Sequence, residues 1–192
     1  MSAKKLIAVV VTSLFVTNTA FAEVIDFNEF GTSFQGGAPF SSGSLYFAST
    51  STILGVWTGS PGVPAYNGTP YLLDANGVLS ITRLDATAYT LNSFEMALGW
   101  YNQSPSTATI AVTYDLVGGG TFSDNLLLTT ETFTTFSPGL AITKASFQLL
   151  GDYSYISIDN IDINDSHVPE PASLALLGLG LAGLSLVRRR KA

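Results

Sequence analysis

Apolar and polar residues alternate along much of the middle of the chain. In the stretch ATIAVTYDL, which covers residues 108–116, every second side chain is apolar and most of those between are polar. A period of two residues is typical of a β-strand with one buried face, because successive side chains point to opposite sides of a sheet. The same alternation recurs in NSFEMALGW (92–100) and KASFQLL (144–150). These segments predict strands whose apolar sides share one core.

Shorter strand-like segments fill the rest of the middle region, with strand-breaking residues between them. Gly, Pro, Asn and Asp gather in GSPGVPAYNGTPY (59–71) and DANG (74–77), where they supply positive φ or remove a backbone donor. GGG at 118–120 lies between two such segments and no Lys follows it, so we expect a hairpin turn and not a phosphate-binding loop. Many short strands separated by turns predict an all-β fold, an antiparallel β-sandwich or jelly roll. The other predicted strands are EVIDF (23–27), SLYFAS (44–49), STILGVW (51–57), VLSITRL (78–84), NLLLTT (125–130) and YSYISIDNIDI (153–163).

The last of these strands contains a change of parity. Ile156 and Ile158 point to one face, whereas Ile161 and Ile163 have the opposite parity. One extra residue must be accommodated between the two pairs if all four side chains are to face the core. We therefore predict a β-bulge at Asp159–Asn160, a feature that often re-aims side chains near a functional site. A bulge whose polar groups only satisfy one another fits the same pattern.

The first 22 residues predict a signal peptide. Lys4 and Lys5 precede an apolar stretch over residues 6–16, and Ala20-Phe21-Ala22 forms a small-x-small site. This order of basic, apolar and small-residue parts is typical of secretory signals. We expect cleavage after Ala22 and export of the chain that follows.

The exported body, residues 23–167, is strongly acidic. Arg83 and Lys144 are its only cations and stand against thirteen acidic residues, a net charge of −11. Such a body repels phosphate backbones, which argues against nucleic acid as a partner, and it attracts divalent cations. Its 145 residues are enough for one domain. The chain has no Cys, so disulfides and thiolate chemistry are excluded.

Catalytic signatures are missing from this body. The one histidine, His167, lies two residues before Pro169 in an expected linker, where it is poorly placed for a Ser-His-Asp triad. Two of the thirteen acids could converge as a carboxylate pair for glycoside cleavage, although the pattern singles out no pair. We expect a protein that is not an enzyme, with a carbohydrate-active enzyme as the alternative.

Calcium is the cofactor that suits this acidity, because the ion binds carboxylate and carbonyl oxygens. Asp26 and Glu29 lie at the end of the first predicted strand, and Asp159 lies in the last. First and last strands are commonly neighbours in jelly rolls, so we predict that these three acids meet and hold Ca²⁺. Solvated surface acids are the alternative interpretation.

Aromatic residues near the turn-rich segments predict a carbohydrate-binding surface. Flat sugar faces stack on Trp and Tyr rings, and aromatics mounted on loops beside Asn and Asp suit such a ligand. Packing in the core is the alternative for each ring. The candidates are Trp57, Tyr66, Tyr71, Trp100 and Tyr101.

The end of the chain has three distinct parts. The triplet Pro169-Glu170-Pro171 precedes sixteen residues without a charge, and RRRK follows them. Sixteen helical residues span about 24 Å, which is short of a hydrocarbon core of about 30 Å, and the basic cluster should stay cytoplasmic. The predicted organisation is a signal peptide over 1–22, a β-sandwich domain over 23–164, a linker with the triplet over 165–171, a transmembrane helix over 172–187 and a basic cytoplasmic tail over 188–192.

With this order of parts, the tail resembles the PEP-CTERM sorting signal of exported Gram-negative proteins. Pro169, Glu170 and Pro171 match the motif of that family residue by residue. The resemblance implies recognition by an exosortase, which is a membrane protease or transpeptidase, and cleavage at or near the motif. It also implies an inner-membrane intermediate and then a place at the cell surface or in the extracellular matrix, in bacteria that make exopolysaccharide and biofilms.

Three functions are compatible with these features. We expect first a non-enzymatic surface or matrix protein whose sandwich binds polysaccharide or calcium. An extracellular carbohydrate-active enzyme and a purely structural, glycosylated biofilm protein are the alternatives.

Overall fold

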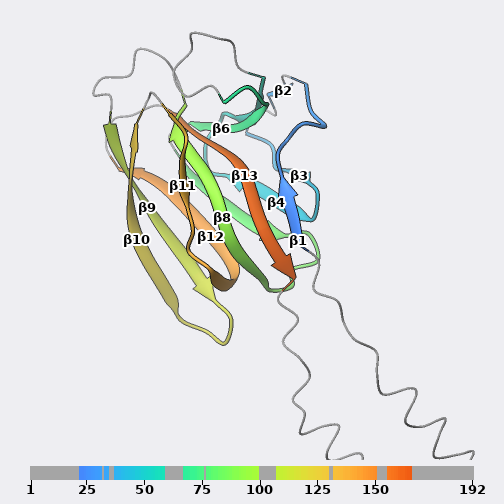
Figure 1. Cartoon of the computed structure of the whole chain (residues 1–192), viewed down its shortest axis with the longest axis vertical. Coiled ribbons are helices and arrows are strands. Elements are labelled where there is room, and N and C mark those ends of the chain that lie inside the picture. Colours follow the sequence, from blue (N-terminus) through green and yellow to red (C-terminus); the bar gives the residue numbers. More distant parts are fainter. Residues whose placement is uncertain are drawn as a thin grey trace, which may run out of the picture.

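The domain is built from β-strands, as a computed structural model of the chain shows (Figure 1). The structure describes residues 22–31, 33–34, 37–58, 67–75, 77–99, 107–129, 132–150 and 155–165. Every regular element within these ranges is a strand. The strands are β1 (Ala22–Ile25), β2 (Ser33–Phe34), β3 (Phe40–Ser42), β4 (Leu45–Ser49), β5 (Leu54–Trp57), β6 (Tyr71–Ala75), β7 (Val78–Arg83), β8 (Tyr89–Leu98), β9 (Thr107–Leu116), β10 (Thr121–Thr129), β11 (Thr134–Phe136), β12 (Leu140–Leu150) and β13 (Tyr155–Asp165).

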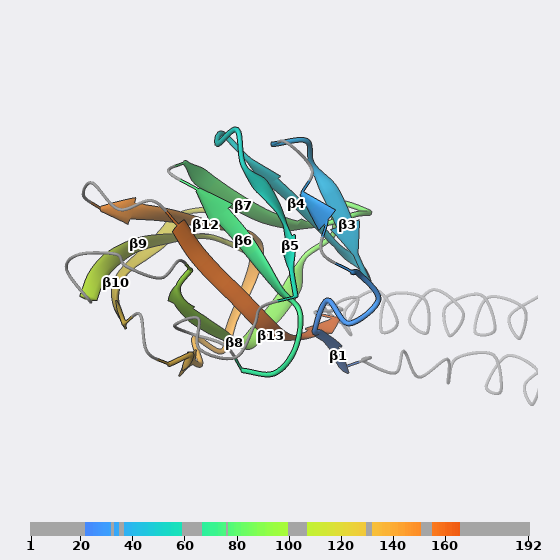
Figure 2. The ribbon, with the colours of Figure 1, turned by 90° about the horizontal axis from the view of Figure 1, so that it is seen from above.

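All strand pairs are antiparallel, which confirms the predicted all-β class. The main path of hydrogen-bonded neighbours runs β2-β5-β6-β13-β8-β12-β7-β4-β3, with β9 and β10 added beside β12. The sheet curls, so that β12, β7, β4 and β3 lie on one side and β8, β13 and β1 on the other (Figure 2). One continuous sheet therefore replaces the two separate sheets that a sandwich was expected to have.

β12 makes the turn from one side of the sheet to the other. Its first residues, Leu140–Ile142, pair with β8, and from Lys144 onward it runs between β9 and β7. The register shifts between Ile142 and Lys144, and a bulge of this kind bends a strand and increases its twist. The corner in β12 thus keeps the hydrogen bonding continuous.

The alternating apolar residues meet in one core between the two sides. Ile110 and Val112 of β9 and Met96 of β8 are completely buried, as the period of two predicts. Phe94 of β8 meets Phe147 of β12 edge to face, with 5.3 Å between ring centroids. Aromatic pairs of this geometry add about 1 kcal/mol to the free energy of burial. The ring pair joins the two sides of the curled sheet.

The sequence pattern predicts no strand at β6, because its residues do not alternate. All four residues from Tyr71 to Asp74 are buried, so both faces of the strand are covered. Strands buried on both faces read as continuous apolar runs without a period of two. The predicted hairpin at 118–120 is confirmed: its three glycines have positive φ and connect β9 to β10.

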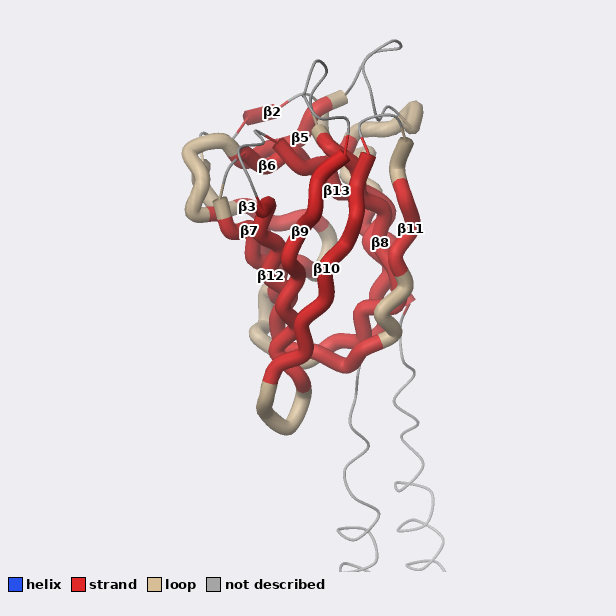
Figure 3. Tube along the Cα trace, turned by 90° about the vertical axis from the view of Figure 1, so that its left-hand side faces the viewer, coloured by secondary structure: helices blue, strands red, loops and turns tan. Residues whose placement is uncertain are grey.

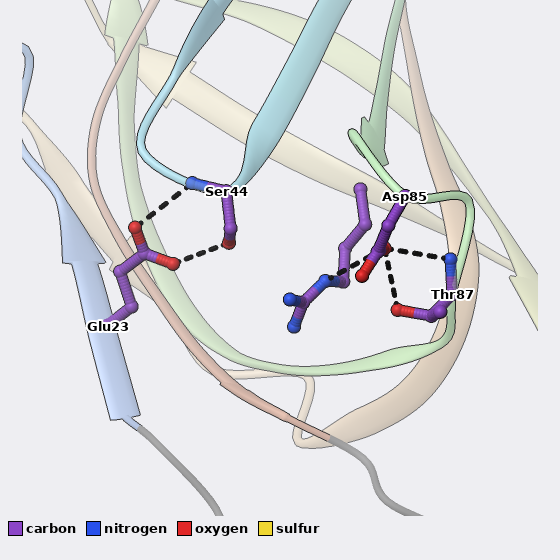
Figure 4. A network of polar contacts seen from close by, with 5 residues as sticks. Glu23, Ser44, Asp85 and Thr87 are labelled. Atoms are coloured by element: carbon purple, nitrogen blue, oxygen red, sulfur yellow. Dashed lines mark hydrogen bonds and ion pairs between the residues drawn. The ribbon is translucent and has the colours of Figure 1, made fainter.

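The two ends of the described domain lie at the same place. β1 pairs with the last part of β13, with Ala22 opposite Asn164, so the first and last strands run side by side (Figure 1). We call this region the tethered end. There the Glu23 carboxylate accepts hydrogen bonds from the backbone and the hydroxyl of Ser44, which fixes β1 to the turn between β3 and β4 (Figure 4).

Candidate functional site

The bulge in β13 is confirmed. The register between β13 and β8 shifts between Asp159 and Asp162, and Asn160 has a φ of 48°. This left-handed conformation is one that Asn tolerates better than most residues. The isoleucines on both sides of the bulge, at positions 156, 158, 161 and 163, are all buried. The bulge therefore accommodates the extra residue and lets all four isoleucines face the core, as the change of parity required.

Asp159 lies at the centre of a polar network that covers the bulge. Its Oδ2 atom accepts hydrogen bonds from Asn67 Nδ2 at 2.7 Å and from Thr69 Oγ1 at 2.9 Å. Its Oδ1 atom accepts from the backbone N–H of Asn160 at 2.8 Å. The carboxylate is completely buried, so it holds the segment before β6 against β13 and has no oxygen exposed to solvent.

A second carboxylate faces the first. Glu95 of β8 is opposite Asp159 in the register, and its Oε2 atom accepts from Asn160 Nδ2 at 2.9 Å. Burial raises the pKa of Asp159 to about 6, the hydrogen bonds from Asn67, Thr69 and Asn160 oppose this rise, and the charge of Glu95 adds to it. Asp159 therefore holds a proton more tightly than an exposed Asp does.

Amides and carboxylates continue along β8 and β13 toward the tethered end. Asn92 Nδ2 donates to Asp162 at 3.3 Å, and Asn164 Nδ2 donates to Asn92 Oδ1 at 3.4 Å. Neutral amides thus hold these carboxylates, since the two cations of the body pair with other acids, Arg83 with Asp85 and Lys144 with Asp115. We call this set the amide–carboxylate row: Asn92, Glu95, Asp159, Asn160, Asp162 and Asn164.

A further buried carboxylate lies on the core side of β6. Asp74 is opposite Leu54 of β5 and Ile156 of β13, and 1% of it is exposed. Burial raises its pKa to about 6, although the Ser49 hydroxyl and the Ala75 backbone favour the charged form. Its Oδ1 atom has no hydrogen-bond partner within the described ranges. Sequence reasoning did not single out this residue.

The three predicted calcium ligands have separate partners. Asp26 accepts from the Asn28 backbone and side chain, at 3.2 and 2.7 Å, and Glu29 accepts from the Ser42 hydroxyl. Asp159 is occupied as described above. Within the part of the chain that the structure describes, no three His, Cys, Asp or Glu side chains gather to hold a metal. Calcium binding stays a prediction.

The predicted carbohydrate-binding aromatics divide into three groups. Tyr71 is 1% exposed and packs edge to face on Phe133 at 5.6 Å, so its ring offers no open face to a sugar. Trp57, opposite Tyr71 in the register, is partly exposed. Tyr66, Trp100 and Tyr101 lie outside the described residues.

The predictions for the two ends of the chain also fall outside the described ranges, apart from Ala22 in β1. These are the signal peptide, the Pro169-Glu170-Pro171 triplet, the transmembrane helix over 172–187 and the basic tail. In the ranges that the structure describes, no helix has the length and apolar character needed to cross a membrane.

Sequence reasoning missed the partners of Asp159. Asn67 and Thr69 belong to the tripeptide NGT, which reads as a turn or a sequon, and Glu95 is one polar position in an alternating strand. Asn67 is 92 residues from Asp159 in the chain, so no local signal connects them. The predicted bulge and the predicted calcium ligand Asp159 marked this region, but neither indicated its partners.

Comparison with known proteins identifies the tail. A model of the PEP-CTERM protein-sorting motif matches residues 167–191, which confirms the resemblance seen in the sequence. No curated protein matches the chain. A protein with this motif is exported and sorted by way of the membrane to the cell surface.

Several solved structures are remotely similar to the chain. The K1 adhesin domain of Lys-gingipain from Porphyromonas gingivalis is 13% identical, with a TM-score of 0.44 over 76% of this chain and 98% of that domain. A xylan-binding domain from Paenibacillus barcinonensis is 14% identical, with a TM-score of 0.41 over 77% and 96%. An exo-beta-agarase is 12% identical, with a TM-score of 0.42 over 72% of this chain; the match spans a quarter of the agarase.

Proposed function

We propose that this protein is an exported cell-surface or matrix protein whose non-catalytic β domain contacts polysaccharide after an exosortase has processed its tail. The observation that carries the proposal is the sorting motif, which begins at residue 167, two residues after the end of β13 at Asp165. The folded domain and the address that sorts it are therefore nearly contiguous in the chain.

The position of the strands supports processing at both ends. We infer a signal peptide over 1–22, and cleavage after Ala22 leaves the rest of β1 paired with β13. We likewise infer a membrane helix over 172–187 as a transient anchor, and cleavage near Pro169-Glu170-Pro171 leaves β13 whole. Neither cut removes more than one residue from a strand, so the body keeps its fold when it is released from the membrane.

The common position of the two ends supports an orientation. Because β1 begins where β13 ends, both membrane-directed segments leave the domain at the tethered end. A domain held in this way directs its opposite end and its outer faces toward the surroundings of the cell. A surface protein in an exopolysaccharide matrix meets polysaccharide there.

An enzyme is the second candidate, because Asp159 and Glu95 form a facing carboxylate pair and Asp159 has a raised pKa. Pairs of this kind carry out glycoside cleavage when one acid protonates the leaving oxygen and the other acts opposite it. Here Asp159 is buried and each of its oxygens accepts a hydrogen bond, which leaves no path to a substrate. Release of reducing sugar from polysaccharide by the mature protein, abolished by Glu95→Gln, would favour the enzyme.

Mass spectrometry of the mature protein from its native cells tests the proposal. We expect a chain that begins at Glu23 and lacks the four cations from Arg188 to Lys191. Replacing Pro169, Glu170 and Pro171 together by Ala should leave the tail on the protein and the protein in the membrane fraction, whereas Ser166→Ala should be processed normally. A mature wild-type chain that still ends in RRRKA would contradict sorting and indicate a permanent anchor.

A further inference from the structure

The outer face of the sheet side formed by β10, β9, β12 and β7 is rich in hydroxyl side chains. On these strands the core-facing residues, such as Val112 and Phe147, alternate with outward-pointing residues, about half of which are Ser or Thr. Figure 3 looks toward this part of the molecule, where β10, β9 and β12 lie next to one another. We call this surface the hydroxyl face and define it by six residues: Ser80, Thr82, Thr109, Thr113, Ser123 and Ser146.

The strand register arranges these side chains in rows. Ser123 of β10 is opposite Thr113 of β9, Thr113 is opposite Ser146 of β12, and Ser146 is opposite Ser80 of β7. Four hydroxyls therefore cross four strands in one line. Neighbouring strands are about 4.8 Å apart, and outward residues on one strand repeat about every 7 Å. The row on one side of this line consists of Asn125, Ala111, Gln148 and Val78, and the row on the other side has Thr121 and Thr82 at its ends. The continuous line of donors and acceptors is therefore this one row of four hydroxyls.

The hydroxyl face is electrically neutral on an otherwise acidic body. Its neighbouring row contains one acid and one cation, Asp115 and Lys144, and their side chains form an ion pair at 2.9 Å. The body as a whole has a net charge of −11. Asp115 is the one acid at the outward positions of these described strands and Lys144 balances its charge, so this area has no net charge.

The side chains of this face are accessible. Ser123 is exposed, while Thr113, Ser146, Ser80 and Thr82 are partly exposed. The hydroxyls of Thr113 and Ser123 lie 3.3 Å apart. Exposed apolar groups lie beside two of the six residues: Tyr46 is opposite Thr82, and Leu127 and Leu150 are both opposite Thr109.

We propose that the hydroxyl face binds the flat side of a neutral, linear polysaccharide. Serine and threonine hydroxyls both donate and accept hydrogen bonds, as sugar hydroxyls do, so the two surfaces can exchange their bonds with water for bonds with each other. Covering hydroxyls costs much less free energy than covering unpaired charges. The bordering Tyr46 ring and leucines offer apolar contact to the C–H faces of sugars.

The charge of the body selects the class of polymer. A net charge of −11 repels uronate-containing or sulfated chains, and a neutral face offers them no cation. A neutral polymer approaches without this repulsion and meets a face that matches its own chemistry. This inference rests on the proposed contact with polysaccharide, and it adds the surface and the class of ligand.

Co-sedimentation of the mature protein with microcrystalline cellulose, agarose beads and covalently crosslinked alginate beads, in buffer without calcium, tests the inference. We expect binding to at least one of the two neutral polymers and none to alginate. The double variant Ser80→Glu, Ser123→Glu places two charges on the face and should weaken binding about tenfold or more, since each charge must be desolvated. The matched control Thr132→Glu, Thr134→Glu adds the same charge at exposed positions near β11, off the face, and should bind within about twofold of wild type.

Each result of this experiment supports or contradicts a specific part of the proposal. If the face variant melts below the control, Ser80→Ala, Ser123→Ala replaces it and should still weaken binding. If the face variants bind like wild type, the hydroxyl face is not the site, although the proposed function stands. If wild type prefers alginate, the class of ligand is wrong. If no polymer is bound, both proposals fail. Gel filtration then tests another occupant: if wild type is a dimer and the face variant is a monomer, the hydroxyl face binds a second copy of the chain.

Discussion

The amide–carboxylate row and the hydroxyl face are both outer surfaces of the same curled sheet, but their polar groups are used differently. In the row, carboxylates and amides bond to one another, as Glu95 does with Asn160 at 2.9 Å, and Asp159 is buried. On the hydroxyl face, the side chains are at least partly exposed and carry no net charge. Polar groups that satisfy one another stabilise a fold, whereas exposed groups are open to a ligand.

The comparison reverses the first impression from composition. Acidity is the most conspicuous property of the body and points to Asp159 as a site. In the folded chain Asp159 connects the segment before β6 to β13 through Asn67 and Thr69. The uncharged Ser and Thr positions form the more accessible surface. Changes in the row should therefore affect stability, and changes in the hydroxyl face should affect binding alone.

The largest effect is expected from Asp159→Ala. This change removes the acceptor of three hydrogen bonds and leaves Asn67 Nδ2 and the Asn160 N–H unpaired, whereas the Thr69 hydroxyl keeps Asn67 Oδ1 as an acceptor at 2.8 Å. The loss should lower the free energy of unfolding by about 3 kcal/mol. Urea denaturation at pH 7 measures this decrease in the free energy of unfolding. Asp159→Asn retains an acceptor and removes a buried charge, so it should cost less. A loss below about 0.5 kcal/mol in the Ala variant would mean that the row does not stabilise the domain.

The next effect is a dependence of stability on pH that comes from Asp74 and Asp159. Both have a folded pKa of about 6, above the ordinary 3.8, so the folded state holds their protons more tightly than the unfolded state. Their stabilising contribution is full below pH 3.8 and is lost as the pH rises through 6, by at most about 3 kcal/mol for each group.

Thermal unfolding between pH 4.5 and 7.5 tests this dependence. The melting temperature of Asp74→Asn minus that of wild type should be larger at pH 7.5 than at pH 4.5. The exposed Asp124→Asn serves as the control and should show no such change. Parallel pH curves for wild type and Asp74→Asn would show that burial of this carboxylate is not the cause.

A smaller effect should separate two substitutions of Asn160. Both Asn160→Ala and Asn160→Gly lose the hydrogen bond to Glu95, but only Ala is sterically strained at a φ of 48°. The Gly variant should therefore be more stable than the Ala variant by about 1 kcal/mol in urea denaturation. Equal stabilities would indicate that the bulge relaxes to another conformation.

The smallest effect on stability is expected on the hydroxyl face. Ser146→Ala removes a hydroxyl that is partly exposed in the middle of the row of four, so the free energy of unfolding should change by less than about 0.5 kcal/mol. Denaturation and polysaccharide co-sedimentation on the same sample measure both properties. A large loss of stability would contradict the proposed difference between the hydroxyl face, which should serve binding, and the amide–carboxylate row, which should stabilise the fold.

The parts of the fold that were predictable depend on short-range geometry. The change of parity between Ile158 and Ile161 predicted the bulge, because a period of two leaves no other way to bury both. The tail was recognisable because its parts follow one another within 25 residues. β6 was not predictable, since both of its faces are buried and the alternation disappears.

The candidate sites required contacts between distant parts of the chain. Alternation within each strand already indicates that Thr113, Ser123 and Ser146 point away from the core, and the predicted hairpin at 118–120 makes the strands of Thr113 and Ser123 neighbours. No local signal indicates that the strand of Ser146 lies beside them. The pairing of β9 with both β10 and β12 brings these three hydroxyls into one row.

Local sequence was thus enough to specify the strand class, the bulge and the address at the end of the chain, because each depends on neighbours in the chain. The curl of the sheet, the meeting of β1 with β13, the burial of Asp159 and the neutral hydroxyl face were set by tertiary structure. Their physical reason is common to all of them: strand pairing joins residues that are dozens of positions apart. Whether a polar side chain supports the fold or stays open to a ligand depends on what that pairing places beside it.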